Sequence, residues 1–375
     1  MDLNPPALTP PMAAPARVQI ADDQMPADAA YRLACEGTSL IWRGDFQNAR
    51  QLLQALWRRV DRKPRKGVAA PVPSAPADLF HRYRQSQGQR ARVLGMLLIE
   101  VAGDYTIALR RAPDLRQACL EAWGPPTGEP RVVALRELMG LVGAHEWRKR
   151  GVPVAALGTD DTDRVHPHYG VFSPVRGEYL DLVARAPLPA DRSLAFDIGT
   201  GTGVIAAVLA RRGVARVVAT DTNERALVCA RDNLVRLGVD PQVQLQAVDL
   251  FPSGQAPLVV CNPPWVPARA HSALERAVYD PDSQMLKGFL AGLAAHLAPG
   301  GEGWLILSDL AEHLGLRTRD ALLALIRAGG LSVRERLDIA PRHPKAADPH
   351  DPLAVARARE VTSLWRLVHA PPGGR

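Results

Sequence analysis

The stretch from Ala195 to Gly203, with the sequence AFDIGTGTG, limits what this chain can fold into more than any other stretch. A short apolar run leads directly into three alternating glycines, and the residues that follow, VIAAVLA, are strong helix formers. Glycines let the backbone turn sharply and let a ligand approach with no Cβ in the way, while the helix N-terminus offers unpaired N–H groups. The order strand, glycine turn, helix predicts a nucleotide-binding turn. Taken alone, it fits a plain tight turn equally well.

The half of the chain around and after this turn alternates between short apolar strands and helical segments. The alternation predicts an α/β fold with a Rossmann-like, doubly wound, seven-stranded sheet. A polar loop at residues 341–352 allows the last strand to be antiparallel. We expect strands near residues 193–198, 215–220, 243–248, 257–261, 302–308, 331–338 and 361–369, and helices at 224–237, 283–297 and 314–328.

A length of 375 residues, 47% of them hydrophobic, is enough for two domains with separate cores. Residues 1–27 are rich in Pro and Ala and predict a disordered tail. Residues 28–160 predict a mainly helical accessory domain with a small β element: two helices within 31–62, joined at Gly44-Asp45, and a possible hairpin of 93–101 with 105–110. Residues 161–375 form the expected ligand-binding domain.

The formal net charge is +7, and residues 41–92 hold twelve Lys and Arg against three Asp. This cluster is typical of a surface for RNA or an acidic protein partner, and a solvated helix face is an equal alternative. No apolar run is long enough to span a membrane, so we expect a cytoplasmic protein with no membrane partner. The four cysteines show no C-x-x-C spacing, and His166 and His168 have no third ligand nearby in the sequence. We therefore expect no metal.

Polar residues follow the predicted strands at their carboxyl ends, where doubly wound sheets bind their ligands. Asp197, Asp221 and Asp249 end the first three strands. Asp221 lies about 20 positions beyond the first glycine, where a carboxylate accepts hydrogen bonds from both ribose hydroxyls. Asp249 is placed to accept from an adenine amine, with Leu250 and Phe251 flanking the ring. Asp221 alone would suit a nicotinamide dinucleotide equally well.

The fourth strand ends in Asn262-Pro263-Pro264-Trp265, for which a nicotinamide enzyme has no mechanical use. A methyl-transfer enzyme has one, because a planar amide or aromatic amine is a poor nucleophile and must be held with its lone pair aimed at the methyl carbon. The side-chain oxygen of Asn262 and the backbone carbonyl of Pro263 can accept its two N–H groups. Pro263 and Pro264 together fix that carbonyl's direction, and Trp265 offers a flat surface to the substrate.

With these motifs, residues from about 165 to 370 resemble class I S-adenosylmethionine-dependent methyltransferases, and within them the HemK/PrmC-like group that methylates glutamine side chains of peptide-chain release factors. The resemblance implies S-adenosyl-L-methionine as cofactor. It assigns Asp221 to the ribose, and Asp249 and Leu250 to the adenine. It assigns Asn262 and Pro263 to the target amide, and Asn262 also to the cofactor site. The residues that it implies around the methionine part of the cofactor are Asp197, Gly199, Thr200, Gly201 and Gly203.

The function stays open between three alternatives, two of which differ only in the methylated substrate. The family more often has Tyr in place of Trp265, and aromatic residues at this position also occur in enzymes that act on RNA or DNA amino groups. The family's Pro-Arg-rich segment is only loosely similar to residues 172–178. We therefore expect N-methylation of a planar amide, first of a protein glutamine in a release factor. The alternatives are an rRNA, tRNA or DNA base amino group and, remotely, an NAD-binding oxidoreductase. Oligomeric state is not predicted.

Overall fold

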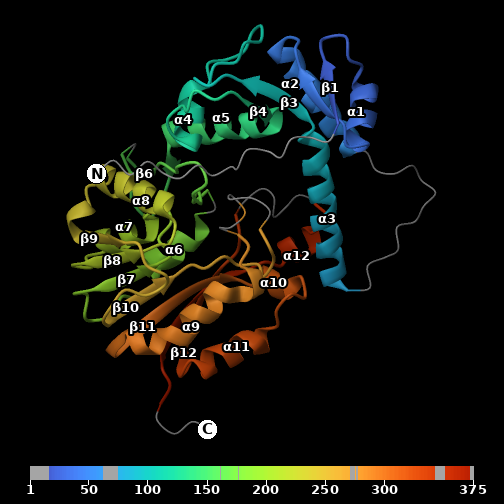
Figure 1. Cartoon of the computed structure of the whole chain (residues 1–375). Helices are drawn as coiled ribbons and strands as arrows, with labels where there is room; N and C mark the ends of the chain where they lie inside the picture. The colour runs from blue at the N-terminus through green and yellow to red at the C-terminus, as the bar shows by residue number, and fades with distance from the viewer. Residues whose placement is uncertain are drawn as a thin grey trace. The chain divides into compact units, whose positions relative to one another are not determined.

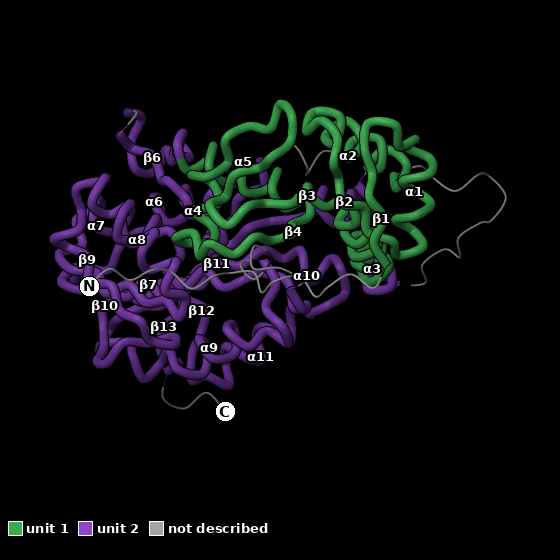
Figure 2. Tube along the Cα trace, turned by 45° about the horizontal axis from the view of Figure 1, so that its top comes forward, with its two compact units in different colours: residues 1–74, 80–148 green, residues 75–79, 149–375 purple. Residues whose placement is uncertain are grey.

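The computed structural model describes residues 17–61, 75–160, 162–175, 177–270, 275, 278–342 and 351–371. Contacts between Cα atoms divide the chain into two compact units, residues 1–74 with 80–148 and residues 75–79 with 149–375 (Figure 2). The second unit resumes at residue 149, twelve positions before the boundary expected from the sequence. Within the described ranges, no helix is both long and apolar enough to cross a membrane.

The first unit is built on a four-stranded sheet with the order β1-β2-β3-β4. The first three strands are parallel, and β4 runs antiparallel to β3. The strands are β1 (Val18–Ala21), β2 (Ser39–Trp42), β3 (Leu97–Val101) and β4 (Arg131–Ala134). The helices in this part of the chain are α1 (Ala27–Cys35), α2 (Phe46–Val60), α3 (Pro76–Leu94), α4 (Arg116–Trp123) and α5 (Leu135–Arg150) (Figure 1).

The first two strands of this sheet differ from the sequence-based expectation. The expected tail of residues 1–27 contains strand β1, whose Val18 pairs with Ser39, while residues 1–16 lie outside the described part of the chain. Leu40 and Ile41, expected in a helix, belong to β2, because that strand lies between β1 and β3 and Leu40 is fully buried there. Apolar spacing within a segment does not reveal distant strand partners, so this pairing overrides the helical pattern.

The possible hairpin is also only half present. Residues 97–101 form β3, whereas residues 105–110 form no strand. Tyr105 has a φ of 69°, and its hydroxyl donates a hydrogen bond to the carbonyl oxygen of Gly124 at 3.0 Å. A backbone in the left-handed region cannot continue an extended ladder, so β3 pairs with β4 instead. The basic residues Arg62, Lys63, Arg65 and Lys66 lie outside the described residues.

The second unit contains the predicted seven-stranded sheet, in the order β12-β13-β11-β10-β7-β8-β9. The strands are β7 (Ala195–Ile198), β8 (Val217–Thr220), β9 (Val243–Gln246), β10 (Ala256–Cys261), β11 (Leu297–Ser308), β12 (Leu331–Ile339) and β13 (Thr362–His369). The strands β7 to β11 are mutually parallel, and β13 is antiparallel to both β11 and β12. The doubly wound fold and its antiparallel last strand are thus confirmed.

Helices and short strands complete this unit (Figure 1). They are β5 (Val152–Pro153), β6 (Arg164–Val165), α6 (Glu178–Arg185), α7 (Val204–Arg211), α8 (Glu224–Arg236), the 3-10 turns Asp240–Gln242 and Pro281–Ser283, α9 (Gln284–His296), α10 (Leu310–His313), α11 (Arg319–Ala328) and α12 (Ala354–Ala358). The helix expected from residue 314 begins only at Arg319. Gly315 has a φ of 68°, and the Thr318 hydroxyl caps α11 by accepting the Ala321 N–H at 3.1 Å.

Helices cover both faces of the seven-stranded sheet, so side chains on both faces are buried. Alternate residues of β10 point to opposite sides, so Leu258 and Val260 pack with α6, α7 and α8, whereas Val259 and Cys261 pack with α9 and α11. A strand buried on both faces must be apolar throughout, which explains why β10 carries no polar side chain before its end. The polar residues therefore appear where the strands stop, at the carboxyl edge of the sheet.

Candidate active site at the carboxyl edge of the sheet

The glycine turn after β7 requires glycine for several reasons. Gly199, Gly201 and Gly203 have φ values of 72°, 56° and 79°, a region that side chains disfavour. A Cβ on Gly201 would meet no atom within 4 Å, so the turn is open at that point. A Cβ on Gly199 would lie 2.5 Å from the Met285 methyl carbon, and one on Gly203 would lie 3.1 Å from the Ala230 Cβ. The turn thus packs against α8 and α9 and leaves one face open.

Asp197, the third residue of β7, is fully buried beneath this turn. Its Oδ2 accepts hydrogen bonds from the Thr200 hydroxyl at 2.6 Å and from the Ala206 N–H at 3.1 Å. Its Oδ1 is shielded from solvent and has no hydrogen-bond partner among the described residues. Burial raises the pKa of Asp197 to about 6, and the two hydrogen bonds oppose that shift. A buried carboxylate oxygen without a donor fits a ligand that brings its own donor, such as an ammonium group.

Asp221, one residue beyond the end of β8, faces the same turn. One carboxylate oxygen accepts the Gly201 N–H at 3.0 Å, and the other accepts the Asn223 N–H at 2.9 Å. Burial raises the pKa of Asp221, while these backbone donors lower it. Each carboxylate oxygen has a further lone pair, so the group can still accept hydrogen bonds from two neighbouring hydroxyls.

The residues predicted for the adenine lie beyond β9. Asp249 is exposed, and Leu250 has a φ of 56° with its carbonyl oxygen accepting the Thr220 hydroxyl at 2.6 Å. The Phe251 ring, expected to flank the adenine with Leu250, stacks instead on the ring of His296 at 4.2 Å between centroids and on that of Phe289 at 5.8 Å. Phe251 therefore packs with α9 in the core.

The Asn262 to Trp265 stretch directly follows β10. The Trp265 indole N–H donates a hydrogen bond to the Asn262 side-chain oxygen at 2.8 Å. The Trp265 ring also meets the buried Tyr179 ring edge-on, with centroids 6.5 Å apart. Both Asn262 and Trp265 are half-buried. The bond fixes which end of the Asn262 amide is the oxygen and leaves one lone pair of that oxygen free.

The segment before α9, which the sequence reasoning did not assign to the site, joins this stretch to the glycine turn. The Asp280 carboxylate is buried and accepts the N–H groups of Met285 at 3.1 Å and Leu286 at 3.2 Å. The Asp280 N–H donates to the carbonyl oxygen of Val266 at 2.9 Å, and the Met285 side chain contacts Gly199. An acidic residue just before a helix, such as Asp280, is a sequence signal for a helix N-terminus. The hydrogen bond of Asp280 to Val266 leaves no such signal in the sequence.

Asn233, on α8, was also missed by sequence reasoning. Its side-chain oxygen accepts the His166 N–H at 2.7 Å, and its amide nitrogen donates to the carbonyl oxygen of Thr202 at 3.1 Å. Asn233 is fully buried, so it ties the segment before α6 to the glycine turn. His168 pairs instead with Asp232 at 3.0 Å. Within the described ranges, no group of three His, Cys, Asp or Glu is placed to hold a metal ion.

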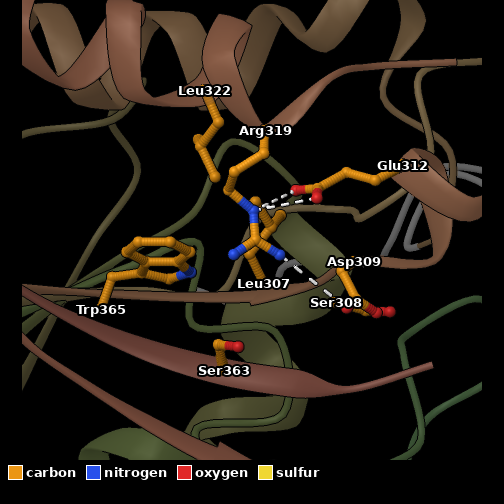
Figure 3. Close-up of a pocket in the computed structure, with 8 residues that line it drawn as sticks. All are labelled: Leu307, Ser308, Asp309, Glu312, Arg319, Leu322, Ser363 and Trp365. Atoms are coloured by element: carbon orange, nitrogen blue, oxygen red, sulfur yellow. Dashed lines mark hydrogen bonds and ion pairs between the residues drawn. The ribbon is translucent and has the colours of Figure 1, made fainter. Parts of the chain in front are cut away.

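A separate pocket lies beyond the end of β11 and contains none of the residues predicted for the site (Figure 3). The Arg319 guanidinium fills it, with Nε 2.9 Å from both carboxylate oxygens of Glu312 and the group 5.2 Å above the Trp365 ring. The pocket has no room for a water molecule. It is therefore a packed ion-pair site. Arg176, the arginine of the loosely similar Pro-Arg segment, lies outside the described residues.

Comparisons with known proteins agree with the resemblance predicted from these motifs. Residues 164–319 match the model of the methyltransferase small domain. A release factor glutamine methyltransferase from Cereibacter sphaeroides is 32% identical over 151 residues, or 36% of this chain and 52% of that protein. A ribosomal protein L11 methyltransferase from Symbiobacterium thermophilum is 40% identical over 184 residues, covering 38% of this chain and 60% of that protein.

Among solved structures, an S-adenosylmethionine-dependent methyltransferase from Thiobacillus denitrificans in complex with S-adenosyl-L-homocysteine is 16% identical, with a TM-score of 0.36. The likeness covers 53% of this chain and 92% of that one. The chain spans about half the length of the release factor glutamine methyltransferases that it matches first, 52% and 54%.

Proposed function

We propose that this chain, whose residues 164–319 match the model of the methyltransferase small domain, transfers a methyl group from S-adenosylmethionine to a planar amide nitrogen. The amide is that of a glutamine side chain in a release factor-like protein. The observation that carries the proposal is that the glycine turn and the Asn262 to Trp265 stretch follow two paired parallel strands, β7 and β10, at one edge of one sheet. There the Trp265 indole N–H donates to the Asn262 oxygen at 2.8 Å. Release factor glutamine methyltransferases among the relatives support the substrate class.

The residues around the glycine turn fit this cofactor. The Asp197 Oδ1, which has no donor among the described residues, suits the ammonium of the methionine part. The open face of Gly201 leaves room for the chain of that part, and Asp221 suits the ribose hydroxyls. When bound, the cofactor supplies an activated methyl group on a sulfonium, so the protein's task is placement rather than strong base catalysis.

The Asn262 to Trp265 stretch then positions the acceptor. The free lone pair of the Asn262 oxygen accepts one substrate N–H, and the carbonyl oxygen of Pro263 accepts the other. Holding both N–H groups directs the nitrogen lone pair away from them and towards the methyl carbon. Trp265 keeps the Asn262 oxygen in place through its 2.8 Å hydrogen bond. Neither acceptor is a base, so the proton that the nitrogen loses passes to water.

The test is methyl transfer with labelled S-adenosylmethionine to three candidate acceptors offered separately: a release factor, ribosomal protein L11 and total RNA. We expect label in the release factor, lost when its glutamine acceptor is replaced and lost with Asn262→Ala enzyme. Label in L11 alone would move the substrate to another protein, as the L11 methyltransferase relatives suggest. Label in RNA alone would reject the glutamine proposal.

One observation favours the nucleic-acid alternative. The exposed Trp57 of α2 lies beneath the guanidinium of Arg90 from α3, whose central carbon is 4.1 Å from the ring centroid. Arg58, the next residue on α2, and Arg82 on α3 are exposed as well. An aromatic ring interleaved with arginines is a surface that RNA bases and phosphates can use. The RNA arm of the assay tests it. Binding to RNA that weakens steeply with salt, and with Arg58→Glu, would strengthen this alternative.

A further inference from the structure

Arg317 lies in the short segment between α10 and α11, just after the carboxyl end of β11. The backbone there is tightly held, because the N–H groups of Leu316 and Arg317 both donate to the carbonyl oxygen of Ala311, at 2.8 and 3.3 Å. The two helices that flank the segment pack in the core through Leu310, Ala311 and Leu322. The position of the Arg317 backbone is therefore fixed by the fold.

Two nitrogens of the Arg317 guanidinium have no hydrogen-bond partner among the described residues. Its Nε and Nη2 atoms are shielded from solvent, and neither makes a hydrogen bond. Burial lowers the pKa of Arg317, the carboxylates of Glu312 and Asp280 oppose this, and Arg319 adds to it. An arginine with desolvated, unsatisfied N–H groups destabilises a fold, since its lost hydration is not replaced.

The two carboxylates near Arg317 are engaged elsewhere. Glu312 is turned towards Arg319, whose Nε lies 2.9 Å from both of its oxygens (Figure 3). Asp280 accepts the N–H groups of Met285 and Leu286 at the start of α9. Neither accepts a hydrogen bond from Arg317. The Arg317 guanidinium therefore lies within reach of two negative charges, but its Nε and Nη2 have no hydrogen-bond acceptor in the part of the chain that the structure describes.

Arg317 follows the carboxyl end of β11, which pairs in parallel with β10, the strand that leads directly into the Asn262 to Trp265 stretch. Asp280, which acts on Arg317 electrostatically, donates its N–H to the carbonyl oxygen of Val266 at 2.9 Å. Val266 directly follows Trp265 in the chain, and Trp265 holds Asn262. Arg317 and the stretch that would hold the methyl acceptor therefore follow neighbouring strands at the same edge of the sheet, with the Asp280 charge acting on Arg317.

We propose that Arg317 receives a carboxylate group brought to this site by the polypeptide substrate or by the cofactor. The proposal rests on the proposed function for the identity of the polypeptide. A carboxylate matches the fork of a guanidinium and replaces two of its missing acceptors in one contact. The bound carboxylate supplies the acceptors that the buried guanidinium lacks. The site therefore favours a ligand that carries a carboxylate over one that does not.

An arginine that serves the fold and one that serves a ligand respond oppositely to replacement. Removing a structural arginine breaks hydrogen bonds and lowers the melting temperature. Removing Arg317 takes away two desolvated N–H-bearing nitrogens without acceptors within the described ranges, so Arg317→Met should raise the melting temperature of the ligand-free protein by a few degrees. Arg327→Met is the matched control, since Arg327 is exposed on α11 of the same unit. The transition to follow is the one that S-adenosylhomocysteine shifts upwards.

Sodium acetate serves as the simplest carboxylate probe, titrated at constant ionic strength against sodium chloride. Acetate should raise the melting temperature of the wild type and of Arg327→Met, and this increase should be absent in Arg317→Met. Equal responses of all three proteins, or a lower melting temperature for Arg317→Met than for Arg327→Met in chloride, would overturn the proposal. Neither result depends on which macromolecule is methylated.

Two binding measurements then identify the source of the carboxylate. If it comes from the polypeptide, Arg317→Met raises KM for the release factor about tenfold or more and leaves the Kd of S-adenosylhomocysteine unchanged. If it comes from the cofactor, that Kd rises by a similar factor and KM for the release factor does not. A wild-type enzyme that leaves the release factor unmethylated would reject the proposed function while the acetate result still decides the role of Arg317.

Discussion

The indole N–H of Trp265 donates a hydrogen bond to the side-chain oxygen of Asn262 at 2.8 Å. Through this bond Trp265 orients the Asn262 amide, in addition to offering a flat surface to the substrate. An asparagine amide can turn by 180° and exchange its oxygen for its nitrogen, and only the oxygen can accept a substrate N–H. The indole is a donor only, so it selects the orientation in which the oxygen is held at the site.

Trp265→Phe is therefore expected to lower kcat about tenfold while leaving the Kd of S-adenosylhomocysteine unchanged. The phenyl ring keeps the aromatic surface beside Tyr179 but cannot donate to Asn262, so the loss is one of orientation. Single-turnover methyl transfer and calorimetric binding measure the two quantities. Trp147→Phe, at an exposed position of α5, is the matched control. An unchanged kcat would show that the bond does not orient Asn262.

Asn262→Ala should have a larger effect on the same step. We expect kcat to fall on the order of a hundredfold, because the lost contact is made to the reacting nitrogen in the transition state. Cofactor affinity should stay within about twofold of the wild type. If calorimetry showed cofactor affinity falling as far as turnover, Asn262 would belong to the cofactor site rather than to the acceptor site.

Asp221→Ala should act in the opposite way. Asp221 accepts the Gly201 and Asn223 N–H groups, so its loss removes both the ribose acceptor and a support of the glycine turn. The Kd of S-adenosylhomocysteine should rise about tenfold or more, with kcat at saturating cofactor within a few-fold of wild type. Asp249→Ala should raise Kd less, because Asp249 is exposed. A larger effect of Asp249→Ala would contradict this order.

The parts of the second unit that follow from local patterns were predictable. Apolar runs that lead into Asp197, Asp221 and Asn262 mark strands buried on both faces. Asp221 and Asn262 directly follow their strands as expected, whereas Asp197 is the last residue but one of β7. The contacts between segments distant in sequence were not predictable. The Asp280 N–H to Val266 bond and the Met285 contact with Gly199 depend on how a loop folds back, which no periodicity records.

The first unit shows the same limit more strongly. Its β2 strand contains Leu40 and Ile41, whose spacing also fits a helix, and the pairing of β2 with β3 joins residues more than fifty positions apart. Strand formation there is decided by partners and burial, since strand propensity expresses packing on a sheet rather than a property of the segment. Phe251 likewise has the position expected for an adenine-flanking ring, but α9 brings Phe289 and His296 against it.

Asn233 offers a test of one such distant contact. Asn233→Ala removes both the bond to the Thr202 carbonyl and the bond from His166, and Asn233→Asp keeps only an acceptor for His166. Both variants should weaken S-adenosylhomocysteine binding several-fold, since the glycine turn loses its donor from α8, and each should lower stability by about 1–3 kcal/mol. A lower melting temperature with unchanged cofactor Kd in the folded protein would limit Asn233 to a structural role.

Asp197 gives the protein a pH dependence whose sign can be worked out. Its pKa is raised from 3.8 to about 6 chiefly by burial, so the folded state binds the proton more tightly than the unfolded state. The stabilisation is fully present below about pH 4 and is lost as pH rises through 6, by an amount on the order of 3 kcal/mol. Asp197→Asn should remove this dependence, so its melting temperature should exceed that of the wild type increasingly between pH 5 and 7.

Cofactor binding should reverse the preference of that carboxyl group. An ammonium beside the unpartnered Oδ1 favours the ionised form, so S-adenosylhomocysteine should bind more weakly at pH 5 than at pH 7 and release a proton on binding at the lower pH. Calorimetry in two buffers of different ionisation enthalpy measures that proton. Asp197→Asn should bind the cofactor more weakly at pH 7 and release no such proton, because the amide carries no charge. Proton release equal to that of the wild type would assign the titration to another carboxyl group, with Asp221 the first to examine because burial raises its pKa too.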